Sequence, residues 1–346
     1  MARELDLGEK IVAGIRETLA VEDEWSIEAE RGLTWWPHGL RQRVWAGAAI
    51  DDHDMTVYRI NVVTDLLREV GADRAEASRV LAPLAGVATA AATVFDPQER
   101  TLRLWTAATA HAEIAGEMTR LLGAFAALQA AEAAAGAGRL AAQLRAMPDT
   151  SAHPRSGARA ATSAGVQDVE AHCLRAGVQR SPWLGGGEIE LAQDLLHQAN
   201  AFASIDDTGM TAELPFGQDT SLMTLALDGR HPRLGNGLEL SLVVPAWGSE
   251  GDTAQLAATI NRAETTMRIA GYLFGSWGVR AFGPNHAPVF NSFVPAALHR
   301  RGTLVNMVLS MALRAEWMTE MLKPDEASAD VAQLIAQRAR QLRADD

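Results

Sequence analysis

The stretch Arg103-Leu104-Trp105-Thr106-Ala107-Ala108-Thr109-Ala110-His111 decides the fold, because a related stretch occurs later in the chain. The second copy begins Ser292-Phe293-Val294-Pro295-Ala296-Ala297-Leu298-His299. Each copy leads into a long segment whose apolar residues recur at helical spacing, from Glu113 to about Arg145 in the first case. A stretch that recurs together with its neighbouring element indicates a duplicated unit.

The elements around the first copy are predicted in the order α-β-β-β-α-β-β-α. Gly32 and Pro37-His38-Gly39 are predicted to form turns around Leu33–Trp36, a segment not counted among the predicted strands. Asp73 is predicted to cap the middle helix, and Pro83 to end it early. The predicted elements before the long helix are a helix at 9–19, strands at 25–30, 41–50 and 55–67, a helix at 74–88, and strands at 91–95 and 101–109.

The second half is predicted to repeat this order between Glu188 and Leu322. Its recognised elements are a helix at 188–202, strands at 220–227 and 238–244, a helix from 252 or 253 to about 269, strands at 272–282 and 289–298, and a helix at 303–322. Gly209-Met210-Thr211 resembles Gly32-Leu33-Thr34, which supports the repeat. The predicted fold class is α+β, with two tandem α-β-β-β-α-β-β-α units. Each antiparallel sheet is expected to pack against helices, and the two units to form a pseudo-two-fold, dimer-like arrangement.

Four regions follow from this pattern. Residues 1–147 form the first unit, and residues 148–187 form a linker rich in Ser, Thr, Gly and Pro. Residues 188–323 form the second unit. Residues 324–346 are predicted to form a C-terminal amphipathic helix, which could serve oligomerisation.

Composition restricts the classes of function. The 346-residue chain carries a net charge of -12 without a basic stripe, so nucleic acid is not an expected partner. Cys173 is the single cysteine, which excludes an intramolecular disulfide. No secretory signal and no stretch of about 20 apolar residues is recognised, so a cytoplasmic protein without a membrane partner is expected. No cofactor is expected.

The element order resembles the type III secretion chaperone fold and the related fold of YbjN-like proteins. In that family two such units dimerise, and this chain is similar to two units fused in tandem. The resemblance implies a protein that cradles an extended segment of a partner, such as a secreted substrate or a regulator. It also implies either a monomeric pseudo-dimer or a homodimer.

Three tryptophans in the first half are candidates for partner binding: Trp35, Trp36 and Trp45. Adjacent strand residues point to opposite faces, so either Trp35 or Trp36 is expected to lie away from the core. Exposed tryptophan is a common anchor in protein interfaces. The alternative is that the second ring packs beneath the N-terminal helix or the linker.

The alternative function is a small-molecule-binding protein or an enzyme with a site between the halves. Its candidate residues are Trp105, His111, Asn291 and His299, the two histidines occupying similar places in the repeat. No acidic partner repeats beside these histidines, so no catalytic residue is assigned. Asp51-Asp52-His53-Asp54 lacks the spacing of a calcium loop, and no metal site is expected.

Overall fold

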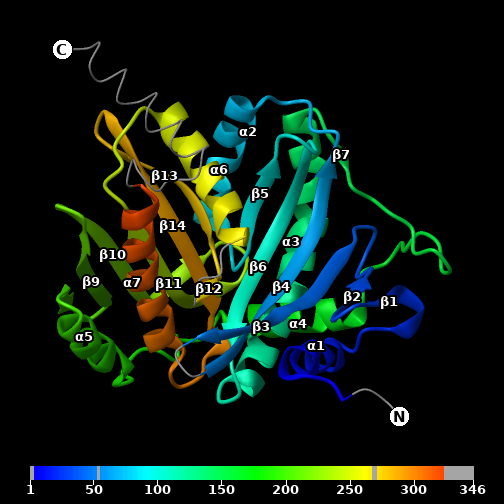
Figure 1. Ribbon diagram of the computed structural model, residues 1–346, viewed down its shortest axis with the longest axis horizontal. Helices are drawn as coiled ribbons and strands as arrows, with labels where there is room; N and C mark the ends of the chain where they lie inside the picture. The colour runs from blue at the N-terminus through cyan, green and yellow to red at the C-terminus, as the bar shows by residue number, and fades with distance from the viewer. Residues whose placement is uncertain (1–3, 53–54, 267–270, 323–346) are drawn as a thin grey trace.

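The computed structural model describes residues 4–52, 55–266 and 271–322 and contains two antiparallel sheets with helices packed against them (Figure 1). This confirms the predicted α+β class. The predicted C-terminal helix at 324–346 lies outside the described residues, as do His53 and Asp54 of the acidic turn.

The first half has one strand more than predicted before its middle helix. The additional strand lies between the two predicted turns, where Gly32–Trp35 pairs with the strands on either side of it. Asp73 caps the middle helix by accepting a hydrogen bond from the Glu76 amide at 2.8 Å. The elements are α1 (Leu7–Thr18), β1 (Ser26–Ala29), β2 (Gly32–Trp35), β3 (Gln42–Asp52), β4 (Met55–Arg68), α2 (Arg74–Leu81), β5 (Ala92–Asp96), β6 (Thr101–Ala110) and α3 (Ala115–Leu144).

The second half also has four main strands before its middle helix, of which the sequence pattern indicated only two. The missed strands are the first two of this half, one of them only four residues long. The elements are α5 (Glu188–Gln198), β8 (Phe202–Ile205), β9 (Gly209–Phe216), β10 (Asp219–His231), β11 (Gly235–Val243), α6 (Glu250–Thr266), β12 (Tyr272–Leu273), β13 (Ser276–Phe282), β14 (Asn285–Pro295) and α7 (Thr303–Met321).

The two sheets share one topology. The first runs β1-β2-β3-β4-β6 with β5 beside β6, and the second runs β8-β9-β10-β11-β14-β13. Gly32 and Gly209 begin equivalent strands, and each lies where a Cβ atom would clash with the carbonyl oxygen of a buried residue on the next strand, Val44 or Leu225. The same close approach in both halves supports the duplication inferred from the sequence.

The halves exchange short segments across their junction. β12 leaves the second half and pairs with β6 of the first sheet, with Leu273 opposite Ala107. In return, the amide of Phe293 on β14 donates to the carbonyl of Thr89 at 3.1 Å. Helices α2 and α6 also pack against each other. These reciprocal contacts are the pattern of a two-fold interface within one chain.

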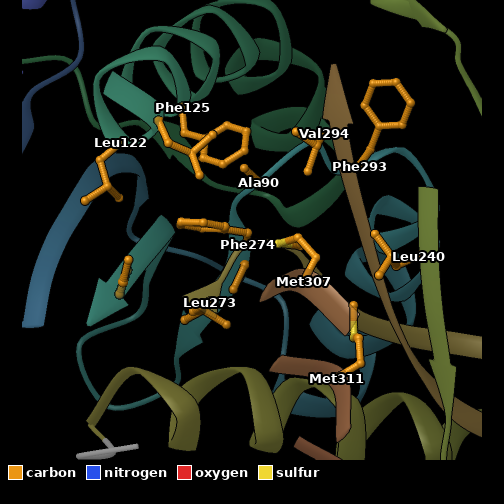
Figure 2. Close-up of a cluster of buried hydrophobic side chains, with 14 of the residues drawn as sticks. Ala90, Leu122, Phe125, Leu240, Leu273, Phe274, Phe293, Val294, Met307 and Met311 are labelled. Atoms are coloured by element: carbon orange, nitrogen blue, oxygen red, sulfur yellow. The ribbon is translucent and has the colours of Figure 1, made fainter. Parts of the chain in front are cut away.

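Gly275 makes this exchange possible. Its φ of 151° lies in the region that favours glycine, and a Cβ there would clash with the carbonyl oxygen of Asn291. The chain therefore passes directly from β12 in the first sheet to β13 in the second. Phe274, at this crossing, is fully buried between side chains of both halves, including Phe125 of α3 and Met307 of α7 (Figure 2).

The predicted linker contains a helix. It begins with the short strand β7 (Met147–Pro148), which pairs with β4, and contains α4 (Ala164–Ala176), which packs against α3. Arg159 fixes the intervening segment by an ion pair with Glu22 at 2.6 Å and a hydrogen bond to the Trp36 carbonyl at 3.0 Å. The linker thus covers part of the first unit.

Helix α3 (Ala115–Leu144) lies within the predicted range of Glu113 to about Arg145. It is the one described helix whose length and composition would allow it to cross a membrane. The core helices of folded proteins share these properties, and 72% of its most apolar window is buried within the fold. In this structure α3 packs against α1, β4 and β6.

Candidate functional site

Trp35 and Trp36 do not form an open surface. Trp35 ends β2 and its side chain is fully buried, with 0% exposed. Trp36 lies beneath the linker, where its indole N–H donates to Ser151 Oγ at 3.0 Å and its ring meets His153 edge to face. The alternative position beneath the linker is therefore the one that Trp36 adopts.

Trp45 lies on the opposite face of the first sheet from Val44, as strand alternation requires. Its ring meets that of Trp105 edge to face, with centroids 5.6 Å apart. The indole N–H of Trp105 donates to Asn61 Oδ1 at 3.2 Å. Both tryptophans are only partly buried, and in Figure 1 α3 lies behind β4 and β6 while no described helix covers β3 and β4 in front.

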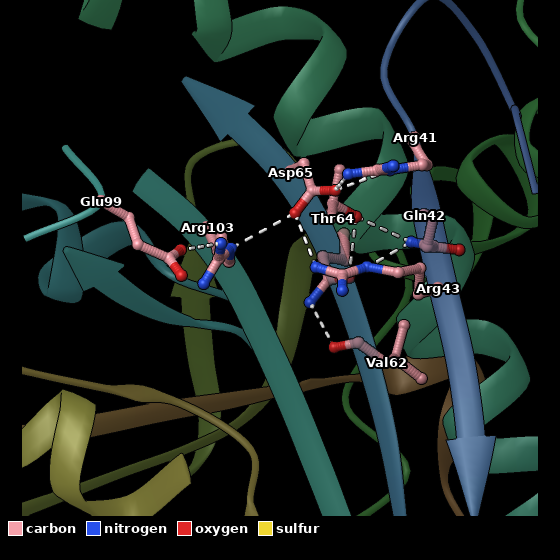
Figure 3. A network of polar contacts seen from close by, with 9 residues as sticks. Arg41, Gln42, Arg43, Val62, Thr64, Asp65, Glu99 and Arg103 are labelled. Carbon is pink, nitrogen blue, oxygen red and sulfur yellow. Dashed lines mark hydrogen bonds and ion pairs between the residues drawn. The ribbon is translucent and has the colours of Figure 1, made fainter. Parts of the chain in front are cut away.

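An arginine cluster continues this face of the sheet. Asp65 on β4 is almost fully buried and accepts from Arg41 Nε and Arg43 Nη2, each at 2.8 Å, while Arg103 Nε lies 3.4 Å away (Figure 3). Arg103 also pairs with Glu99. The Asp149 carboxyl also lies within electrostatic reach of Arg41 and Arg103, so three carboxylates face the three guanidinium groups. We call the residues Arg41, Arg43, Trp45, Asn61, Asp65, Arg103 and Trp105 the tryptophan–arginine face.

Behind this face the first core contains a buried polar network. Gln42 donates to Thr64 Oγ1 at 2.9 Å and to Gln129 Oε1 at 3.2 Å, and Gln129 donates to Thr106 Oγ1 at 3.1 Å. All four side chains are buried. Hydrogen bonds between buried side chains fix the packing of strands and helix, so we assign the network a structural role, although the buried Gln42 Oε1 has no hydrogen-bond partner within the described ranges.

The four residues proposed for a site between the halves have separate surroundings. Trp105 contacts Trp45 and Asn61, whereas Asn291 Oδ1 accepts from Ser241 Oγ at 2.8 Å in the second sheet. His299 meets Trp183 edge to face, and His111 follows the end of β6. These contacts do not assemble the four side chains into one site.

A different cavity lies between the halves, and we call it the inter-half pocket. Its volume is about 420 Å³, within the range of small-molecule sites. Helix α3 forms one wall, and the turn between β10 and β11 contributes the other half's residues. The lining residues are Leu66, Leu84, Val87, Ala88, Ala91, Thr93, Leu104, Glu132, Ala135, Gly136, Arg139, Leu140, His231, Pro232 and Arg233.

Glu132 is the acidic group of this pocket. Its Oε1 accepts from the amide of Thr89 at 3.2 Å and also from the Thr89 hydroxyl. Burial raises the pKa of the Glu132 carboxyl, and the Thr89 hydrogen bonds and the nearby charge of Arg233 oppose that rise. The carboxyl thus faces an apolar cavity with incomplete compensation for its charge.

Glu132→Gln is expected to raise the melting temperature at pH 8 and to have little effect at pH 4. Because the pKa of Glu132 is raised in the folded protein, the folded state binds the Glu132 proton more tightly than the unfolded state does. This binding contributes fully to the free energy of unfolding at pH values below the ordinary pKa of 4.5. This contribution to stability is lost as the pH rises through the pKa of Glu132 in the folded protein, whereas the glutamine of the variant stays neutral at every pH. Thermal unfolding followed from pH 4 to pH 8 measures this, and a gain that does not vary with pH would contradict it.

His231 closes one side of the inter-half pocket without offering a catalytic nitrogen. Its Nδ1 accepts from the amides of Arg233 and Leu234, both at 3.2 Å, so Nε2 carries the proton and donates to the Val87 carbonyl at 2.9 Å. Burial lowers the pKa of His231. The neutral ring therefore joins the β10–β11 turn of the second half to the first half.

The remaining chemistry-bearing residues do not form a site in the described part of the chain. No group of three His, Cys, Asp or Glu side chains is placed there to hold a metal ion. Cys173 is buried, which raises the pKa of its thiol to about 11, so it is protonated at neutral pH and a poor nucleophile.

Comparison of the chain with protein families, with curated proteins and with solved structures finds no match.

Proposed function

We propose that this protein is a non-enzymatic binding module that holds an extended segment of another protein on its tryptophan–arginine face. The observation that carries this proposal is the pair Trp45–Trp105, two partly buried rings on a sheet face that no described helix covers. Large aromatic side chains beside arginine are the commonest anchors of protein interfaces.

The chemistry of the face favours a partner segment with acidic and apolar side chains. The side chains of Arg41, Arg43 and Arg103 are 25–42% exposed, so their guanidinium groups can donate to carboxylates of a partner. Charge complementarity of this kind determines specificity and the rate of association. The resemblance of the repeated unit to secretion chaperones supports the same class of function, with a secreted substrate or a regulator as the partner.

The equivalent face of the second sheet lacks this pair. In the register of the repeat, Ala226 stands where the first half has Trp45, and Asn291 stands where it has Trp105. The binding face therefore belongs to the first half. The alternative of an enzyme at Trp105, His111, Asn291 and His299 gains no support, because these residues do not share contacts.

Binding of acidic, apolar peptides is expected to weaken about tenfold or more in Trp45→Ala, the loss typical of an interface anchor. The measurement is fluorescence polarisation of labelled peptides in which Asp and Glu are either kept or replaced by Lys. Trp247→Ala is the matched control, because Trp247 is 42% exposed and lies in the second half. Equal losses in both variants, or tighter binding of the Lys peptides, would overturn the proposal.

A further inference from the structure

The inter-half pocket has room because the face of α3 that lines it carries two small residues, Ala135 and Gly136. Glu132, Ala135, Gly136, Arg139 and Leu140 recur at the spacing that places them on one helix face, and all five line the cavity. A Cβ atom on Gly136 would have Leu140 Cδ1, at 3.9 Å, as its nearest neighbour. Glycine is less favourable than alanine within a helix, so Gly136 lowers the stability of α3 while it leaves the space beside the helix unfilled.

The walls of the pocket are apolar over most of their area. Leu66, Leu84 and Leu104 face it from the first half, and they belong to the same core cluster as Leu140. Val87, at its edge, is 45% exposed, an apolar side chain left open to solvent. An aliphatic ligand would bury these surfaces and gain about 25 cal/mol per Å² of apolar area.

One end of the pocket is acidic. Glu132 forms no ion pair with any residue that the structure describes, while Arg233, whose charge acts on Glu132, is paired with Glu170. Two carboxylates thus share one guanidinium group at this end. Arg139 lines another part of the pocket, but it is exposed to solvent, which screens its charge.

We propose that the inter-half pocket binds a small molecule with an aliphatic body and a protonated primary amine. The ammonium group forms an ion pair with Glu132 and donates hydrogen bonds to its carboxylate, while the aliphatic body packs against Leu104 and Leu140. The attraction between an ammonium group and a carboxylate is stronger in an apolar site than in water, and together with the apolar contacts it offsets the desolvation of the two charges. This site is separate from the tryptophan–arginine face and does not depend on the function proposed for it.

The test uses three probes that share one chain and differ in head group: n-octylamine, 1-octanol and octanoate. Titration calorimetry at pH 7.5 is expected to show octylamine binding about tenfold or more tightly than octanoate, with octanol between them. In Glu132→Gln, which keeps an oxygen to accept from Thr89, octylamine is expected to lose this advantage while octanol is unchanged. Tighter binding of octanoate, or no effect of Glu132→Gln on octylamine, would overturn the proposal.

A matched pair of glycine variants tests the location. Gly136→Leu places a side chain in the cavity and is expected to abolish binding of both octylamine and octanol. Gly138→Leu changes the same helix at an exposed position with nothing within 4 Å of its Cβ, and it is expected to leave both affinities unchanged. Both variants are first compared by thermal unfolding. Equal effects of the two folded variants on binding would place the amine elsewhere and overturn the proposal.

Discussion

Arg314→Leu is expected to lower the free energy of unfolding by about 3–5 kcal/mol, the cost of leaving one member of a buried ion pair alone. Arg314 on α7 donates from Nε to Glu264 Oε1 at 2.8 Å, and both side chains are less than a tenth exposed. Its Nη2 also donates to the Tyr272 carbonyl at 2.7 Å, and its guanidinium lies 3.8 Å from the centre of the Phe290 ring. Urea unfolding measures the loss.

The effect should reach the first half, because Glu264 is held from both sides of the junction. Arg59 on β4 donates to the backbone carbonyl of Glu264 at 2.8 Å, and the indole of Trp277 donates to its Oε1 at 3.1 Å. The double variant Arg314→Leu with Glu264→Gln removes the isolated charge and is expected to recover at least half of the loss. A double variant as unstable as Arg314→Leu would show that packing, not charge, dominates.

The long-range exchange between the halves could not be predicted from local patterns. The alternation and spacing of apolar residues indicated β6 and α3 because these elements depend on residues close together in sequence. Residues 272–282 were predicted as one strand, whereas Gly275 divides them between two sheets. Only the pairing with β6, more than a hundred residues earlier, decides where the first part lies.

Strands with turn-forming or strand-disfavouring residues were the other failure of the sequence analysis. Gly32–Trp35 has only four residues, and its flanking glycine and proline are typical of turns, yet pairing on both sides makes it a strand. β9 contains Pro215 and Glu213, which propensity disfavours in strands. In both places tertiary pairing outweighs local preference.

The candidate site was predicted in part. Strand alternation correctly placed Trp45 away from Val44, but the burial of Trp36 depends on Ser151 and His153 of the linker, which no local pattern connects to it. The pairing of Trp45 with Trp105 required the neighbouring positions of β3, β4 and β6. The inter-half pocket was missed, although Ala135-Gly136 within a helix between Glu132 and Leu140 was a signal of open space.

Phe274→Ala is expected to cost about 3–5 kcal/mol and to lower the stability of both halves together. Phe274 is fully buried, its ring centre lies 4.8 Å from that of Phe125 in the first half, and it stacks on Tyr272 at 5.0 Å. Because one core cluster contains buried side chains from both halves, we expect a single unfolding transition. Circular dichroism and tryptophan fluorescence, followed during urea unfolding, should report the same midpoint.

The matched control for this prediction is Phe282→Ala, which removes the same side chain from β13, where it is 37% exposed. Its ring contacts only the partly exposed Trp247 among the aromatic residues described, so a loss of no more than about 1.5 kcal/mol is expected. If Phe274→Ala instead produced two transitions, with only one shifted, the halves would fold as independent domains. The exchange of β12 and Thr89 across the junction would then contribute little to cooperativity, whereas a single shifted transition would make the junction the centre of one folding unit.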